Sequence, residues 1–107
     1  MARLQIAFEH LKRGDFARAR SHAQEAVELE SKNFVGHYAL GRALLGIGEV
    51  EQAVAQLETA LKLAPDSPET CFSLAQAYAR AGKKEQAARM RERFQELDKK
   101  RRGWRGQ

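Results

Sequence analysis

Apolar and small residues in the middle of the chain follow a helical period. They recur at intervals of three and four residues on both sides of Gly48, as they do on one face of an amphipathic helix. The positions are Leu40, Gly41, Leu44 and Ile47 before the glycine, and Val50, Ala53, Val54, Leu57, Ala60 and Leu61 after it. Glycine adopts the backbone geometry of a tight turn more readily than residues with a side chain. The pattern therefore predicts two helices joined at Gly48.

This helix–turn–helix pattern occurs three times. The phrases RGDFARA, IGEVEQA and AGKKEQA hold a glycine and an alanine at matching places, and corresponding residues lie 34 positions apart. The residues in register are Gly14, Gly48 and Gly82, followed by Ala19, Ala53 and Ala87. A fixed period of this length is typical of stacked repeats, in which no unit buries its apolar face alone. Three units are predicted at about residues 1–33, 34–67 and 68–101, followed by a basic tail at 102–107.

Capping signals and composition agree with six helices and no sheet. Pro65 ends the middle unit, and Ser67-Pro68 is typical of a helix start, with a serine cap and a proline in the first turn. Strong helix formers dominate the chain, whereas Val, Ile and Thr are scarce. The fold class is therefore all-α, in a single domain of 107 residues. The expected helices cover residues 2–13, 15–30, 34–47, 49–63, 68–81 and 83–101.

The repeat resembles that of the tetratricopeptide repeat (TPR) family, whose pattern is W-x2-L-G-x2-Y, then A-x3-F, then P. The middle unit matches best, with His37-x2-Leu40-Gly41-x2-Leu44, Ala53-x3-Leu57, Ala60 and Pro65. The third unit has Cys71-x2-Leu74-Ala75-x2-Tyr78 and Ala87. The first unit has Arg3-x2-Ile6-Ala7-x2-His10, Ala19-x3-Ala23 and Ala26. The resemblance implies an α-solenoid of three helix pairs in a right-handed superhelical stack. In the third unit, Arg91 and Lys99 replace the large apolar residue and the proline, so we expect a polar last helix that ends the array.

The predicted first helix of each unit carries a second stripe, which in the middle unit is Val35, Tyr38, Arg42 and Leu45. In TPR proteins the first helices line a concave groove that holds a peptide or a partner helix. The resemblance therefore implies a binding groove lined by Leu4, Phe8, Leu11, Tyr38, Arg42, Leu45, Phe72 and Gln76. Aromatic and arginine side chains are also the types enriched at binding hot spots. The alternative is that these side chains cover the neighbouring second helices or mediate self-association.

The ligand of such a groove is expected to be a peptide with apolar anchors. Some TPR grooves clamp a terminal carboxylate with Lys and Asn on successive first helices, and here Leu4 and Phe8 occupy those places. Arg42, Lys12 and Arg80 remain available for an acidic group of the ligand, although Lys12 and Arg80 also suit solvated helix ends. The predicted function is that of a protein–protein interaction module without catalysis.

Other chemistry finds little support in the sequence. His10, His22 and His37 form no pair at i, i+4, and Cys71 stands alone. His10, His37 and Cys71 fall in core positions of the repeat, and no phosphate-binding loop is present. We therefore predict no catalytic residue, no metal site and no cofactor. The lone cysteine, with no leader pattern and no apolar run of membrane-spanning length, weakly favours a cytoplasmic location.

Two rival functions stay open. The net charge is +5, and the last part of the chain is strongly basic around Trp104, which raises nucleic-acid or acidic-surface binding as an alternative. The basic residues are Arg89, Arg91, Arg93, Lys99, Lys100, Arg101, Arg102 and Arg105, with Glu92, Glu96 and Asp98 interleaved as in a solvated helix. The other rival is a structural segment that self-associates. Met1 lies at the first helix without a cap, which favours a segment of a longer protein, and an uncovered edge at Ile6, Ala7 and residues 15–30 suggests a weak homodimer.

Overall fold

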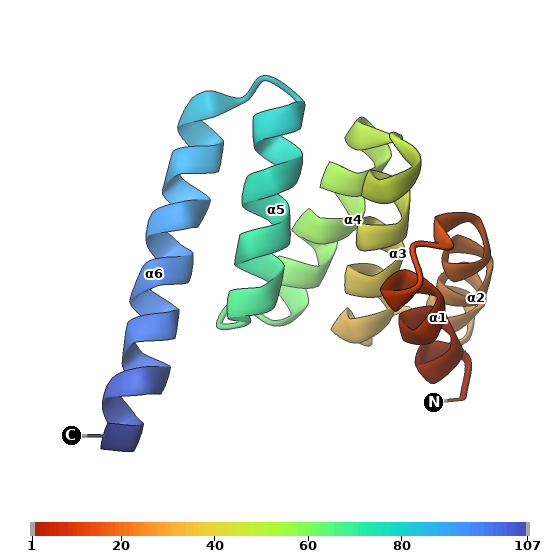
Figure 1. Cartoon of the computed structure of the whole chain (residues 1–107), viewed down its shortest axis with the longest axis horizontal. Coiled ribbons are helices and arrows are strands. Elements are labelled where there is room, and N and C mark those ends of the chain that lie inside the picture. The colour runs from red at the N-terminus through yellow and green to blue at the C-terminus, as the bar shows by residue number, and fades with distance from the viewer. Residues whose placement is uncertain (1, 107) are drawn as a thin grey trace.

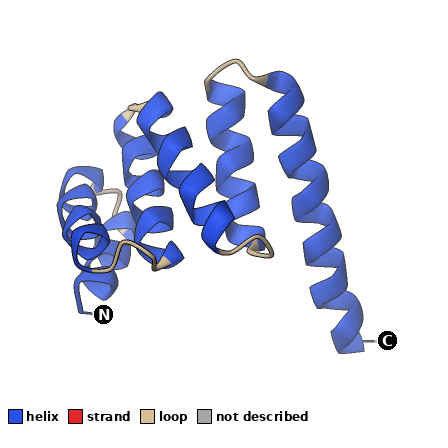
Figure 2. Ribbon diagram, turned by 180° about the vertical axis from the view of Figure 1, so that it is seen from behind, coloured by secondary structure: helices blue, strands red, loops and turns tan. Residues whose placement is uncertain are grey.

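Six helices follow one another as three hairpins in the computed structural model, which describes the backbone of residues 2–106 and the side chains of residues 2–103. The helices are α1 (Ala2–Lys12), α2 (Phe16–Leu29), α3 (Phe34–Ile47), α4 (Val50–Leu63), α5 (Pro68–Arg80) and α6 (Lys84–Gly106). The described residues contain no strand, as Figure 2 shows, so the predicted all-α class is confirmed. The predicted bounds hold within one residue, except that α6 continues five residues beyond 101. The start of the predicted basic tail is therefore part of the last helix.

Each hairpin turns at a glycine in the left-handed region of backbone space. The φ angles are 75° at Gly14, 100° at Gly48 and 80° at Gly82, where a side chain would be strained. In each hairpin the residue after the glycine donates its backbone N–H to the carbonyl five positions earlier. These bonds are Asp15 to His10 (2.8 Å), Glu49 to Leu44 (2.9 Å) and Lys83 to Tyr78 (2.8 Å). The three turns therefore share one geometry, as the period of 34 residues predicted.

Side-chain caps set the starts of three helices. The carboxylate of Asp15 accepts the N–H of Arg18, and the side chain of Asn33 accepts the N–H of Val35. The Ser67 hydroxyl accepts the N–H of Thr70, with Pro68 in the first turn of α5. The start predicted at Ser67-Pro68 is therefore confirmed. These bonds satisfy backbone donors that the first turn of a helix leaves without a partner.

The three hairpins stack in chain order, as Figure 1 shows. Helix α2 packs on α3 and α4 packs on α5, while the first helices α1, α3 and α5 also touch in sequence. Within the described part of the chain, α2 does not contact α4, and α4 does not contact α6. Because the first helices lie closer together than the second helices, the stack bends with α1, α3 and α5 on its inner side.

The two junctions between units are packed differently. At the α2–α3 junction, a Cβ on Gly36 would lie 3.3 Å from Val27 Cγ2, and one on Gly46 would overlap the ring of Phe16. These glycines let the helices approach closely. The positions 34 residues further along are Thr70 and Arg80, whose side chains occupy space that the glycines leave free. Helix α5 also packs less extensively on α4 than α3 packs on α2, so the α4–α5 junction is more open.

The open junction forms a cleft between α4 and α5 that is crossed by polar contacts. Its apolar lining includes Leu61, Pro65 and Leu74. The hydroxyl of Tyr78 donates a 2.6 Å hydrogen bond to Glu58 Oε2 across the junction. At the carboxyl end of α5, Arg80 Nη1 donates a 3.0 Å bond to the carbonyl oxygen of Leu45, in the last turn of α3. Hydrogen bonds therefore supplement apolar contact between the second and third units.

Both outer edges of the stack are largely polar. On α1, Gln5 and Glu9 are exposed at register positions where the second unit buries Ala39 and Ala43. Ile6 on this edge is partly exposed, but Ala7 is fully buried, so the apolar edge is smaller than the sequence suggested. On α6, Arg91 is exposed as expected for a terminal helix, and the helix runs past Lys99 without a break. Self-association through these edges stays a prediction.

Candidate partner-binding surface on the first helices

The eight residues predicted to line a groove divide into two groups. Leu4, Leu11 and Leu45 are 6%, 6% and 8% exposed and belong to the hydrophobic core. These three leucines therefore pack inside the protein, and the prediction that they line a groove is wrong. The remaining five are partly or largely exposed, and we call them the first-helix surface: Phe8, Tyr38, Arg42, Phe72 and Gln76.

An aromatic and cationic cluster joins α1 to α3. The ring centroids of Phe8 and Tyr38 lie 6.2 Å apart with an interplanar angle of 37°. The guanidinium carbon of Arg42 lies 5.7 Å from the centre of the Tyr38 ring, within the range of a cation–π interaction. Arg42 lies one helical turn beyond Tyr38, so the helix itself places the guanidinium near the ring. Tyr38 is therefore the member of the cluster that contacts both Phe8 and Arg42.

A second aromatic pair joins α5 to α6. Phe72 is 49% exposed, and its ring centre lies 5.3 Å from that of Phe94 at an angle of 52°. Sequence reasoning missed Phe94. It occupies the register of Ala26 and Ala60, and an aromatic residue at a position that is alanine in the other units was the available signal. The larger side chain reaches Phe72 and adds apolar area beside it.

Arg42 is the charged side chain of the first-helix surface. Lys12 and Arg80 are exposed at the carboxyl ends of α1 and α5, and Arg80 shares a pocket with Glu49 and Glu51 at the start of α4. Glu69, in the first turn of α5, accepts a 3.0 Å hydrogen bond from Arg101 on α6. That bond holds the pKa of Glu69 below its usual value, so its charge is present at neutral pH and is met by Arg101.

The three histidines and the cysteine pack against, or hydrogen-bond to, other residues of the chain. His37 is buried, with Nδ1 2.8 Å from Gln56 Oε1 and Nε2 2.7 Å from the carbonyl oxygen of Ser31, so its predicted packing role is confirmed. His10 stacks on His22 with ring centres 5.6 Å apart. Burial raises the pKa of the Cys71 thiol, which disfavours the reactive thiolate. Within the described residues, no group of three or more His, Cys, Asp or Glu side chains has an arrangement that could hold a metal ion.

The basic residues of α6 are partly neutralised within the chain. Arg93 pairs with Asp66 at 2.9 Å, and Arg102 pairs with Asp98 at 3.0 Å. With the Arg101–Glu69 pair, three basic side chains of the predicted cluster face carboxylates. The side chains of Trp104 and Arg105, part of the same prediction, lie outside the described residues. No helix in residues 2–106 has the length and apolar character needed to cross a membrane.

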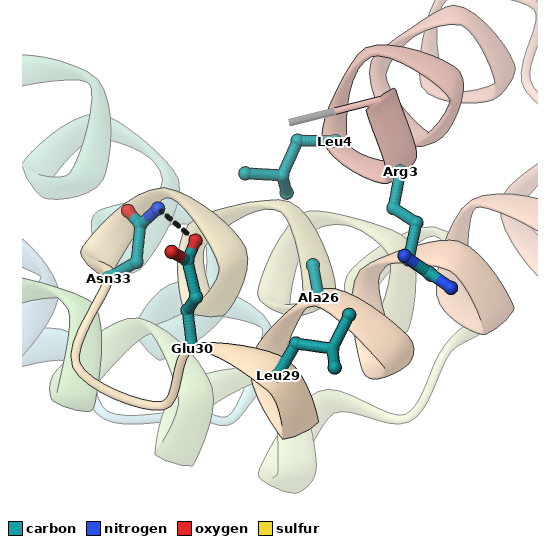
Figure 3. Close-up of a pocket in the computed structure, with 6 residues that line it drawn as sticks. All are labelled: Arg3, Leu4, Ala26, Leu29, Glu30 and Asn33. Atoms are coloured by element: carbon teal, nitrogen blue, oxygen red, sulfur yellow. Dashed lines mark hydrogen bonds between the residues drawn. The ribbon is translucent and has the colours of Figure 1, made fainter.

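A small pocket lies at the amino end of α1, and its lining shares no residue with the first-helix surface. Its lining consists of Arg3, Leu4, Ala26, Leu29, Glu30 and Asn33. Figure 3 shows the apolar side chains between Arg3 on one side and the Asn33–Glu30 hydrogen bond of 3.4 Å on the other. Leu29 is 66% exposed here, which makes it a useful comparison site for an apolar residue off the first-helix surface.

The stacked hairpins, glycine turns and small residues at the helix contacts define a helical-hairpin repeat protein. The family model for the tetratricopeptide repeat matches residues 10–69 and, in a second overlapping match, residues 48–104. The chain therefore belongs to the tetratricopeptide repeat family. No curated protein matches its sequence.

Solved structures with the same fold have low sequence identity to the chain. The second TPR of Spaghetti (RPAP3), bound to the HSP90 peptide SRMEEVD, is 19% identical, with a TM-score of 0.85 over 90% of this chain and 89% of that one. The type III secretion translocator chaperone SycD of Yersinia enterocolitica is 19% identical, with a TM-score of 0.84 over 90% and 66%. MamA from Desulfovibrio magneticus RS-1 is 21% identical, with a TM-score of 0.85 over 94% and 56%. The chain thus spans little more than half of that MamA structure.

Proposed function

We propose that this chain is a protein-interaction module whose first-helix surface binds an extended or helical segment of another polypeptide, without catalysis. The observation that carries the proposal is the half-exposed Phe72, which lies with Phe94 on the same side of the stack as Tyr38 and Arg42. Large aromatic side chains left accessible beside an arginine are typical of binding hot spots.

The solved structures support this proposal by analogy of fold. The second TPR of Spaghetti (RPAP3) is bound to a peptide, and SycD is a chaperone, so both act on other polypeptides. In this chain the family's carboxylate-clamping positions hold Leu4, which is buried, and Phe8, which packs against Tyr38. The contact with a ligand would therefore depend on aromatic packing around Tyr38 and Phe72.

A pull-down that compares two double variants tests the proposal. Tyr38→Ala with Phe72→Ala removes aromatic area from the first-helix surface, and each truncation of a hot spot typically costs about 2 kcal/mol of binding free energy. Leu29→Ala with Leu63→Ala is the matched control, because those residues are 66% and 41% exposed on second helices. Proteins captured by the wild type should be lost with the first pair and retained with the second. Circular dichroism and a thermal melt confirm that each variant is folded.

The same experiment addresses the rival site at the basic end of α6. Removal of residues 102–107 should leave the captured partners unchanged. Loss of capture after this deletion, together with normal capture by the Tyr38→Ala and Phe72→Ala variant, would overturn the proposal. Binding through α6 to a polyanion would also weaken steeply as salt is raised.

A further inference from the structure

We propose that the cleft between α4 and α5 is a second binding site, which takes a basic side chain of a partner polypeptide with its charged head at Glu58. The site lies on the outer side of the stack, away from the first-helix surface. It therefore goes beyond the proposed function and does not depend on it.

The cleft lies on the face of α5 that points away from the first-helix surface. Leu74 and Tyr78 of α5 line it. They follow Phe72 and Gln76 of the first-helix surface by two residues each. Two residues of an α-helix correspond to a rotation of about 200°, so the two pairs lie on opposite sides of α5. In the described part of the chain α4 does not contact α6, so the second helices do not close over the cleft.

The size and lining of the cleft suit a long side chain with an apolar stem. Its volume is about 750 Å³, which leaves room for part of the backbone that carries such a side chain. Leu61, Pro65 and Leu74 supply apolar walls, while Glu58 and Lys62 bring the charged groups. Lysine and arginine bury their methylene stems along apolar surface and keep the charged head at a polar group. An anionic head group would instead meet the carboxylate of Glu58.

The carboxylate of Glu58 carries the argument, because the structure holds it in the cleft without a cation. Its Oε2 accepts the 2.6 Å bond from Tyr78, and no described Lys, Arg or His nitrogen lies within ion-pair distance of it. A carboxylate has about four acceptor sites, so the single Tyr78 bond leaves most of them free. A half-buried charge costs free energy unless a partner compensates it. A basic side chain would do so through a charge-assisted hydrogen bond.

Support of the Tyr78 hydroxyl does not by itself require a charge. Gln24 and Leu44 occupy the register of Glu58 and Tyr78 in the preceding units. A glutamine, as at position 24, would also accept the hydrogen of a tyrosine hydroxyl without bringing a charge into the cleft. The pocket at the α2–α3 junction is lined by Gln24 together with Arg20, which would repel a basic side chain. Electrostatics therefore assign the basic partner to the second junction alone.

Lys62 competes for the same carboxylate from within the chain. It is exposed one turn beyond Glu58 on α4, a spacing at which glutamate and lysine form ion pairs. Such pairs on a helix surface are weak, and the Lys62 ammonium does not lie within ion-pair distance of Glu58. Arg89 on α6 acts on the cleft from further away, since it lowers the pKa of Tyr78 against the larger effects of burial and Glu58. A partner side chain that also packs its stem on Leu74 displaces these contacts.

Fluorescence anisotropy of labelled synthetic peptides with the full chain tests the inference. Each peptide carries one lysine among alanine and leucine residues, and matched versions carry norleucine, which lacks the ammonium group, or glutamate. The lysine peptide should bind at least about tenfold more tightly than the norleucine version, since hydrogen bonds to charged groups are among the stronger ones. Glu58→Gln keeps an acceptor for Tyr78 and should remove that preference. Lys62→Gln should raise the affinity for the lysine peptide.

Glu51→Gln is the matched control, because Glu51 is exposed on α4 and does not line the cleft. It should keep the preference for lysine, as should the Tyr38→Ala and Phe72→Ala variant. Circular dichroism and a thermal melt confirm that each variant is folded. A preference that survives Glu58→Gln, or one that is lost with the Tyr38 and Phe72 variant, overturns the inference because the lysine then binds elsewhere.

The remaining outcomes concern the occupant. Equal binding of the lysine and norleucine peptides, or absence of binding to either, overturns the basic partner. Hexylamine that binds as tightly as the lysine peptide, with the same dependence on Glu58, would show a site for a small amine and overturns the polypeptide occupant. The pull-down with the first-helix variants decides the proposed function separately.

Discussion

The hydroxyl of Tyr78 on α5 donates a 2.6 Å hydrogen bond to the carboxylate of Glu58 on α4, and this contact spans the open junction between the second and third units. Tyr78 is buried against the cleft that its neighbours Leu61 and Leu74 line. The bond requires a protonated tyrosine, because a tyrosinate next to the carboxylate would be repelled. The stability of this junction is therefore linked to pH.

The unfolding free energy is expected to fall at high pH because of Tyr78. Burial, followed by the hydrogen bond to Glu58, raises its pKa from 10.0 to about 12. A group whose pKa is raised in the folded state contributes stability below its unfolded pKa and loses it as pH rises through the folded value. The loss should amount to roughly 2 kcal/mol between pH 10 and 12. Urea unfolding across this range, compared with Tyr78→Phe, measures it, and parallel pH curves for the two proteins would contradict the assignment.

Gly46→Ala should destabilise the α2–α3 junction although alanine favours helix formation. The new Cβ would overlap the ring of Phe16, and such overpacking typically costs about 1–3 kcal/mol. Gly103→Ala in α6 is the control, because an added Cβ would meet no described atom beyond its own stretch of helix within 4 Å, and helix propensity predicts a gain of up to about 1 kcal/mol. Chemical denaturation gives both values. Phe16→Ala should reduce the penalty of Gly46→Ala, and a penalty that stays the same would contradict the proposed clash.

His10→Phe should stabilise the protein. Among the described residues, Nδ1 of His10 is buried without a hydrogen-bond partner, and Oδ2 of Asp15 is 3.8 Å away. Removing a buried polar atom that lacks a partner should recover about 1–3 kcal/mol. His37→Phe provides the opposite case, because both ring nitrogens of His37 are bonded, and it should lower the melting temperature. Equal shifts in the two thermal melts would contradict this reading.

Deletion of the third unit should lower the unfolding free energy of the two units that remain, because it also removes their contact with α5. Helix α5 packs on α4, with Leu61 and Leu74 lining their junction, and stacked repeats share their stability with their neighbours. The two-unit protein should unfold at a clearly lower urea concentration and with lower cooperativity. A midpoint equal to that of the full chain would show that the units are stable independently.

Much of the fold could be predicted because its determinants are local or periodic. Gly14, Gly48 and Gly82 need a positive φ angle, which a glycine tolerates regardless of what surrounds it. Ser67 and Pro68 define a helix start through groups within one turn. The candidate surface was harder to predict. The second stripe of each first helix identified Tyr38, Arg42 and Phe72, but it also included Leu4, Leu11 and Leu45, which the core buries.

The sequence by itself determined the three-unit register, the six helices and the face of each helix that packs, because backbone preference and helical period act over a few residues. Tertiary structure decided which side chains stay accessible. The spacing between units depends on residues from both sides of a contact, such as Phe16 against Gly46 in one junction, while Thr70 and Arg80 replace the glycines in the other. Phe94 meets Phe72, and Arg101 meets Glu69, only because α6 folds back along α5. Such contacts join residues more than twenty positions apart, and helical period carries no information about distances of that kind.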